Sequence, residues 1–291
     1  MTETKSLTEL AGRGHRAMDV LHGVSYYAPE VDQKLADAGL RPGRMCYFAS
    51  RSAAMGAVSA GVTTATFYNF NPALVARHIP RAWGLASLDD ILAARLRGAD
   101  RALRRLLGDD VALSPAIHEA ADLARAATVE LSPQGRPLYA AHAELPWPAE
   151  PHLALWHAAT LLREHRGDGH VAVLLGSGLT GLEALITHTA TGRGFTVAAA
   201  KATRGWSDAE WAIGQAGLRA REILDDDGGL TAAGMELRNA VERATDELGA
   251  APWITIGPEA TDRLIDLGRG LSRQLLASGA FSADVFARSG G

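Results

Sequence analysis

The fold is decided by residues 206–234, whose sequence is WSDAEWAIGQAGLRAREILDDDGGLTAAG. From Asp208 the chain reads as a helix that ends near Leu224, because Ala, Leu and Arg recur at helical spacing. Residues 225–229 then form a turn, since Asp and Gly are the residues that turns favour. Thr231 opens another helix at a position where threonine is a good cap. The stretch therefore predicts a helix, a tight turn and a second helix.

The composition of the whole chain fits a globular protein that is mainly helical. Of 291 residues, 47% are hydrophobic and 21% are charged, so the chain can bury a large core. The formal net charge of -4 lacks the basic excess that a dedicated nucleic-acid binder usually has. A single cysteine, Cys46, excludes an internal disulfide and the multi-cysteine kind of zinc site.

No segment of the sequence predicts a membrane location. Residues 1–10 are polar and lack the apolar stretch of a secretory signal. The best apolar run, residues 171–175, is far shorter than the ~20 residues that a membrane-spanning helix needs. We therefore expect a cytoplasmic protein with no membrane partner.

Prolines divide the chain into two parts. Residues 132–149 are rich in proline and glycine, which is typical of a linker. The sequence therefore predicts an N-terminal unit over residues 1–131 and a C-terminal unit over residues 150–291.

The two predicted units share a pattern of helix ends. In the first unit a helix ends at Leu107, a turn follows, and a long helix reaches Thr128. In the second unit the equivalent positions are Leu224 and Thr245, at a constant spacing from the first pair. The pattern predicts an internal duplication. The alternative is that any two segments of this kind look alike.

A resemblance to a known family supports this reading. Residues 206–234, with the segment LREHRGDGH (residues 162–170) before them, resemble the recognition helix, wing and following helix of MarR-type winged-helix regulators. The chain is similar to an actinobacterial family of MarR-like helix-turn-helix proteins, over the second unit well and over the first loosely. The resemblance implies a mainly α fold of tandem winged-helix-like units with small β-wings and a pseudo-twofold axis. It also implies a pocket where the two units meet.

The arginines of the first unit are the expected DNA contact. In a winged helix the second helix enters the major groove and the wing touches phosphate, but residues 225–227 place three aspartates at the second unit's wing. An acidic wing repels the backbone phosphates. The first unit instead has a basic helix face, for which the alternative is a solvated face paired with nearby aspartates. The predicted DNA-binding residues are Arg97, Arg101, Arg104 and Arg105.

The first helix has a polar stripe that predicts a metal site. His15, Asp19, His22 and Tyr26 follow one another at three- or four-residue steps, so neighbouring members lie on one helix face. Two imidazoles beside a carboxylate suit a divalent metal, with the phenol as a further ligand. The alternative is the exposed side of an amphipathic helix.

Two segments, residues 46–51 and residues 67–71, contain the best mixture of aromatic and polar residues for a small-molecule site. Arg51 is expected to anchor an anion and Tyr68 to orient a polar ligand, because pockets combine apolar walls with a few polar groups. The alternatives are a packed aromatic cluster with Arg51 in a salt bridge, and core positions for the remaining members. The predicted ligand-binding residues are Arg51, Tyr68, Asn69, Trp156 and His157.

The sequence contains no catalytic motif, since it lacks the G-x-S-x-G, Walker A and H-E-x-x-H patterns, and no enzymatic activity is assigned from it. The leading hypothesis is a ligand-responsive, MarR-like winged-helix regulator that binds a small molecule between its two units and duplex DNA through its arginines. The alternative is a winged-helix scaffold that no longer binds DNA and holds a metal, a haem-like cofactor or a substrate. Both hypotheses allow a monomer or a homodimer.

Overall fold

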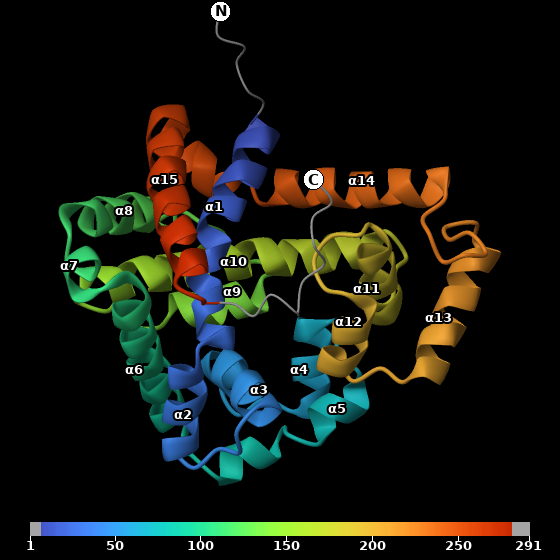
Figure 1. Cartoon of the computed structure of the whole chain (residues 1–291), viewed down its shortest axis with the longest axis horizontal. Coiled ribbons are helices and arrows are strands. Elements are labelled where there is room, and N and C mark those ends of the chain that lie inside the picture. Colours follow the sequence, from blue (N-terminus) through green and yellow to red (C-terminus); the bar gives the residue numbers. More distant parts are fainter. Residues whose placement is uncertain (1–6, 281–291) are drawn as a thin grey trace, which may run out of the picture.

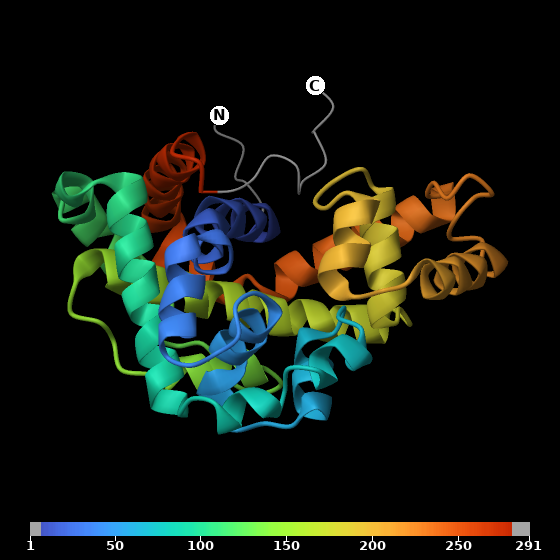
Figure 2. The same ribbon diagram turned by 60° about the horizontal axis from the view of Figure 1, so that its bottom comes forward.

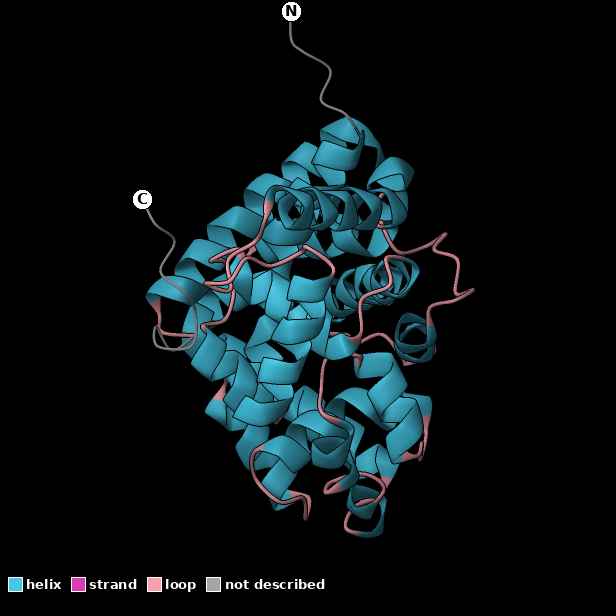
Figure 3. Ribbon diagram, turned by 90° about the vertical axis from the view of Figure 1, so that its right-hand side faces the viewer, coloured by secondary structure: helices cyan, strands magenta, loops and turns pink. Residues whose placement is uncertain are grey.

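A computed structural model of the chain describes residues 7–280. Within these residues it contains helices and loops and no β-strand (Figure 3). The α-helices are α1 (Leu7–Tyr27), α2 (Pro29–Asp37), α3 (Arg44–Ser52), α4 (Ala60–Phe67), α5 (Pro72–Ala76), α6 (Leu88–Leu107), α7 (Asp109–Ala112), α8 (Pro115–Ala126), α9 (Pro137–Ala143), α10 (Pro151–Gly176), α11 (Gly181–Ala190), α12 (Val197–Arg204), α13 (Asp208–Ala220), α14 (Ala232–Leu248) and α15 (Ala251–Ala277). Two short 3₁₀-helices are η1 (Ala53–Met55) and η2 (Arg81–Gly84).

Polar side chains at the helix starts explain where several of these helices begin. Ser87 accepts a hydrogen bond from the backbone N–H of Asp90 at the start of α6, and Ser114 caps α8 in the same way, as the sequence predicted. Ser207 and Glu210 form a reciprocal capping box at the start of α13. Local chemistry therefore sets these boundaries.

The small β-wings predicted from the sequence are absent from the described residues, and that prediction was wrong. At the expected wing, Leu224 and Leu230 form one isolated antiparallel bridge around a tight turn. The Asp225 carboxylate accepts a hydrogen bond from the backbone N–H of Gly229 at 2.7 Å, and the Asp225 N–H donates to the Gly229 carbonyl. Because the aspartate itself closes the turn, no paired strands are needed to hold it.

The predicted pseudo-twofold tandem of winged-helix-like units was also wrong. Helices α6 and α13 were the expected equivalents, but α6 packs against α2 whereas α13 packs against α11. The connections differ too, because α7 follows α6 while the turn between Leu224 and Leu230 follows α13. The shared sequence pattern marks helix ends, which resemble one another in many folds, and it does not mark shared packing.

Most helices surround one large core. Helix α1 packs along α15, and α10 packs against α8, α1 and α14. The core joins residues from Ala11 to Ala280, on both sides of residues 132–149. The predicted units over residues 1–131 and 150–291 stay a prediction.

A smaller second core joins the end of α10 to α11, α12, α13 and α14. Figures 1 and 2 show these helices, which we call the second module, at one side of the molecule, with α10 running into them from the main body. With 26 residues, α10 spans about 39 Å at ~1.5 Å per residue. One rigid helix therefore belongs to both cores.

No single described helix has the length and apolar character needed to cross a bilayer. The pair α10 and α11 meets that test only when its two helices are taken together across a bend of 100°. Of the polar residues 1–10, residues 1–6 lie outside the described part of the chain.

Candidate functional site

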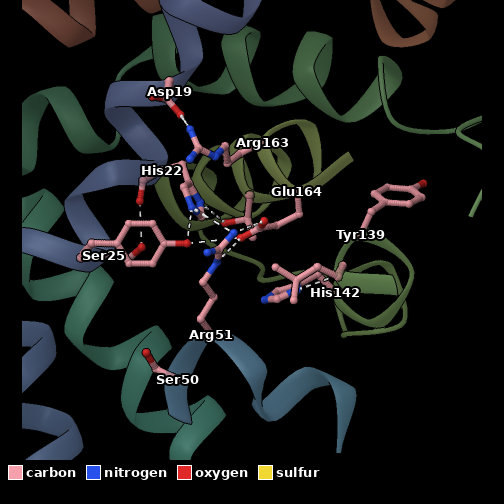
Figure 4. A network of polar contacts seen from close by, with 12 residues as sticks. Asp19, His22, Ser25, Ser50, Arg51, Tyr139, His142, Arg163 and Glu164 are labelled. Atoms are coloured by element: carbon pink, nitrogen blue, oxygen red, sulfur yellow. Dashed lines mark hydrogen bonds and ion pairs between the residues drawn. The ribbon is translucent and has the colours of Figure 1, made fainter. Parts of the chain in front are cut away.

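A buried ion pair lies where α1, α3 and α10 meet (Figure 4). Arg51 on α3 donates twice to Glu164 on α10, from Nη2 to Oε2 at 2.7 Å and from Nε to Oε1 at 3.0 Å. Only 1% of the Glu164 side chain is exposed. Burial by itself raises the pKa of Glu164, but the Arg51 charge and its hydrogen bonds hold that pKa well below its ordinary value. Glu164 is therefore ionised, and the two-point contact fixes α3 against α10.

His22 and Tyr26 on α1 extend the ion pair into a network. The Tyr26 hydroxyl lies 2.7 Å from His22 Nε2 and 3.3 Å from Glu164 Oε1. On the other side of the ring, His22 Nδ1 lies 3.1 Å from the hydroxyl of Thr160, which itself donates to the Trp156 carbonyl. Because that hydroxyl has used its proton, Nδ1–H is the donor and Nε2 accepts from Tyr26. Burial lowers the pKa of His22 well below its ordinary value, which agrees with this neutral form.

The four residues predicted to bind a metal are divided between different contacts. His22 and Tyr26 belong to the network, whereas Asp19 accepts a hydrogen bond from Arg163 at 2.6 Å. Burial lowers the pKa of His15 to about 3. Within residues 7–280, no group of three or more His, Cys, Asp or Glu side chains is placed to share a metal ion. Metal binding by this stripe stays a prediction.

An open pocket of about 310 Å³ adjoins the network, between the end of α1 and the starts of α2 and α3. We call it the α1–α3 pocket. The hydroxyl of Tyr47 in its wall accepts a hydrogen bond from Arg51 Nη1 at 3.3 Å, so the pocket wall contacts the buried ion pair directly. The side chains that matter most in its wall are Tyr26, Val31, Leu35, Arg44 and Tyr47.

Tyr68 and Asn69, predicted to orient a ligand, instead lie in a segment that contacts the second module. The Tyr68 hydroxyl donates to the carbonyl of Leu179 just before α11. The carbonyl of Asn69 accepts from Trp206 Nε1 at 2.9 Å, and its side-chain oxygen accepts from Arg204 Nε at 3.2 Å. We call residues 68–71 the clamp segment, because they join the main body to the start of α11 and the end of α12.

Asn71 completes the clamp segment. Its backbone N–H donates to the carbonyl of Arg204, and its side-chain nitrogen donates to Glu210 Oε1, both at 2.9 Å. Arg204 ends α12, and Glu210 lies in the first turn of α13. The clamp segment therefore binds both helices on either side of one turn.

Helices α12 and α13 form a helix–turn–helix unit. The turn between them has three residues, 205–207, and Gly205 takes the left-handed conformation with φ of 76° that ends α12. Trp211 and Leu218 bury one face of α13 in the second core. The opposite face exposes small and apolar side chains, of which Ile213 is 73% exposed.

That exposed face of α13 contains no lysine or arginine. Arg219 donates to the carbonyls of Asp225 and Asp226, and Arg221 pairs with Glu183 at 3.1 Å. The face itself consists of Ala209, Ala212, Ile213, Ala216, Gly217 and Ala220, all exposed. The unit has the short turn of a helix–turn–helix, and the outward face of its second helix lacks the cations that a nucleic-acid reader usually has.

Of the four arginines on α6 that were predicted to contact DNA, two form ion pairs and two do not. Arg104 donates to Asp100 and Asp109, each at 2.8 Å, and Arg105 pairs with Glu30. Arg97 and Arg101 are exposed, and among the described residues neither has a carboxylate within 4.0 Å, although Asp37 lies near enough to Arg101 to interact with its charge. Two of the four arginines therefore remain available to a partner.

Trp156 and His157, predicted to line a ligand site, are buried in the core. The guanidinium of Arg95 lies 4.8 Å over the Trp156 ring and donates to His142 Nε2 at 3.0 Å. His157 packs edge-on against Trp147 with 4.7 Å between ring centroids. Their predicted role in ligand binding stays a prediction.

The sequence analysis did not predict that the charged residues Arg95 and Glu164 are buried in the same core. The available signal was register: Arg95 falls four residues after Ile91 and four before Ala99, both fully buried positions of α6. A charged residue in the apolar stripe of a helix indicates a buried partner elsewhere, although the sequence does not say which residue that is.

Comparison with known proteins bears on this geometry. The model of a helix-turn-helix family matches residues 11–282, which include both α12 and α13. No curated protein and no solved structure matches the chain.

Proposed function

The chain belongs to a helix-turn-helix family, and on that premise we propose that it is a cytoplasmic, MarR-like regulator that binds duplex DNA and responds to a small molecule. The small molecule occupies the α1–α3 pocket. The clamp segment transmits its presence to the helix–turn–helix unit. The actinobacterial likeness of the sequence is part of the same proposal.

One observation carries this proposal: a line of rings joins the pocket to the helix–turn–helix unit. Tyr47 in the pocket wall packs against Phe70 of the clamp segment with 5.5 Å between centroids. The guanidinium of Arg204 lies 4.5 Å over the Phe70 ring and 4.8 Å over Phe195. Because packed rings have little free space, a ligand that displaces Tyr47 also displaces the end of α12.

The backbone of the clamp segment supports a switching role. Tyr68 has φ of 59°, a left-handed value that costs ~1–3 kcal/mol for a residue with a side chain. The start of α11 holds it there, since a Cβ on Gly181 would lie only 1.9 Å from the Tyr68 carbonyl oxygen. The backbone conformation of Tyr68 therefore depends on the position of α11 beside it.

We place the DNA contact on α6, at Arg97 and Arg101. Phosphate neutralisation by free cations supplies most non-specific affinity for DNA. These two exposed arginines form no ion pair within 4.0 Å in the described part of the chain, whereas the exposed face of α13 is apolar and its neighbouring turn carries Asp226 and Asp227.

The test is binding to a labelled DNA duplex over a range of salt concentrations. The double variant Arg97→Ala, Arg101→Ala should bind at least ~10-fold more weakly and reduce the salt slope by about 2. The control variant removes Arg243 and Arg263, which are 58% and 54% exposed and lie on α14 and α15. Equal losses in the two variants, or no duplex binding by the wild type at low salt, would contradict the regulator proposal.

The surface of α13 favours a second function. A helix–turn–helix unit whose outward α13 face exposes Ile213 and no cation suits a scaffold that no longer reads DNA and uses the α1–α3 pocket to hold a substrate or cofactor. This function predicts small-molecule binding by a protein that binds no duplex at any salt concentration.

A further inference from the structure

Arg44 brings an unpaired positive charge into the wall of the α1–α3 pocket. It is the first residue of α3 and is partly buried. Among the described residues no carboxylate lies within ion-pair distance of its guanidinium, in contrast to Arg51 deeper in the molecule. Its guanidinium lies 5.9 Å from the centroid of the Tyr47 ring. The pocket therefore has a cation beside an aromatic surface.

Positive charges outnumber negative charges near the pocket. Among the described residues of the wall Asp32 is the one carboxylate; its Oδ1 accepts a hydrogen bond from the backbone N–H of Gly43 at 2.8 Å, and its single negative charge offsets that of Arg44. Glu164 behind the wall is matched by Arg51. Arg204 adds a further positive charge close to the aromatic wall, and within the described residues its side chain donates to the neutral side chains of Asn69 and Thr203. The local field thus favours an anion.

The remainder of the wall favours an apolar body on that anion. Three tyrosines, Tyr26, Tyr27 and Tyr47, line the pocket, and its aliphatic surface includes Val31 and Leu35. The volume of about 310 Å³ lies at the small end of the roughly 300–1,000 Å³ that ligand pockets occupy. Helix α3 also begins at this wall, and its cap Gly43 has no side chain to occupy the first backbone N–H groups. A single ring with a short acidic side chain fits these limits.

We propose that the α1–α3 pocket binds a small organic carboxylate with an aromatic or cyclic body. The Arg44 guanidinium pairs with the carboxylate, and the ring lies against Tyr26 and Tyr47. The inference rests on the proposed function in taking the same pocket as the ligand site. It adds the chemical class of the ligand and the residue that selects it.

The experiment compares two probes that differ in one charge, phenylacetate and its neutral isostere phenylacetamide, by titration calorimetry at low ionic strength without DNA. The wild type should bind phenylacetate at least ~10-fold more tightly than phenylacetamide. Arg44→Gln should remove that preference while leaving phenylacetamide affinity within about twofold, which also reports that the pocket is folded. Arg44→Lys should restore part of the preference because the charge returns without the two-pronged geometry.

Arg41→Gln is the matched control, because Arg41 is an exposed arginine three residues earlier and is not part of the pocket wall. The inference is overturned if the acid and the amide bind equally, if Arg41→Gln and Arg44→Gln have the same effect, or if neither probe binds at roughly 10 mM. The regulator proposal is tested separately, by DNA binding. A protein that selects phenylacetate through Arg44 and binds no duplex keeps this inference and loses the regulator role.

Discussion

The core where α1, α3 and α10 meet and the helix–turn–helix unit at the far end of α10 place their polar residues in opposite ways. In the core, Glu164 and His22 are buried, the Arg51 side chain is only 13% exposed, and each has a partner. In the helix–turn–helix unit the outward face of α13 is apolar, with Ile213 73% exposed. The named polar groups of the first region contact one another or neighbouring helices, so they determine structure. The second leaves apolar surface uncovered, which suits contact with another molecule.

The largest effect is expected from breaking the ion pair in the core. Glu164→Ala removes the carboxylate and leaves the Arg51 guanidinium, whose side chain is only 13% exposed, without its counter-charge. Loss of one partner of a buried pair destabilises a protein by about 3–5 kcal/mol, because the remaining charge stays desolvated. Urea unfolding followed by circular dichroism measures this loss.

The comparison variant for Glu164→Ala is Glu236→Ala on α14. Glu236 also pairs with an arginine, Arg243, but its side chain is 67% exposed and water replaces the lost contact. Similar unfolding midpoints for the two variants would show that the ion pair in the core does not hold α3 against α10.

An intermediate effect is expected from pH, through His142 in the same core. Burial first, and the Arg95 charge second, lower the pKa of His142 to about 3. The unfolded histidine titrates near ~6.5, so between these values the unfolded chain binds the extra proton and stability falls as pH falls. This one residue should cost about 2 kcal/mol of unfolding free energy between about pH 7 and about pH 5.

The measurement for His142 is the pH dependence of the unfolding free energy in two variants. His142→Gln retains an acceptor for Arg95 but cannot titrate, so its stability should fall less steeply with acid than the wild type. His118 on α8 is exposed, and His118→Gln should keep the wild-type slope. A wild-type slope in His142→Gln would mean that this histidine is not held neutral in the core.

Helix starts were the most predictable part of the fold. Ser87 and Ser114 were assigned correctly as caps, because a cap depends on contacts within three residues. The β-wing prediction failed because paired strands, unlike helix caps, depend on contacts outside the local sequence. The sequence around Asp225 specifies a turn, and whether strands continue from a turn depends on packing that a local pattern does not contain.

The candidate site was less predictable, since it is made by distant pairings. Arg51 was predicted both as an anion anchor and as a salt-bridge partner, and the structure pairs it with Glu164, 113 residues away in the chain. Tyr68 was singled out for its aromatic and polar character, but its neighbours in the structure belong to the second module. Residue type indicated that these positions matter, while the fold decided what each contacts.

The smallest effect is expected at the clamp segment, where the two regions meet. Trp206→Phe removes the hydrogen bond from Nε1 to the Asn69 carbonyl and retains most of the ring, at a cost of about 1 kcal/mol. If the clamp segment seats the helix–turn–helix unit, the loss should be local, and amide exchange in α12 and α13 should quicken by roughly fivefold. Trp83→Phe is the matched control, since Trp83 Nε1 donates to the Val58 carbonyl at 2.8 Å within the main body. It loses the same kind of bond and should leave exchange in α12 and α13 unchanged. Should both variants quicken exchange in α12 and α13 equally, those helices open only by global unfolding and the clamp segment does not link the pocket to them.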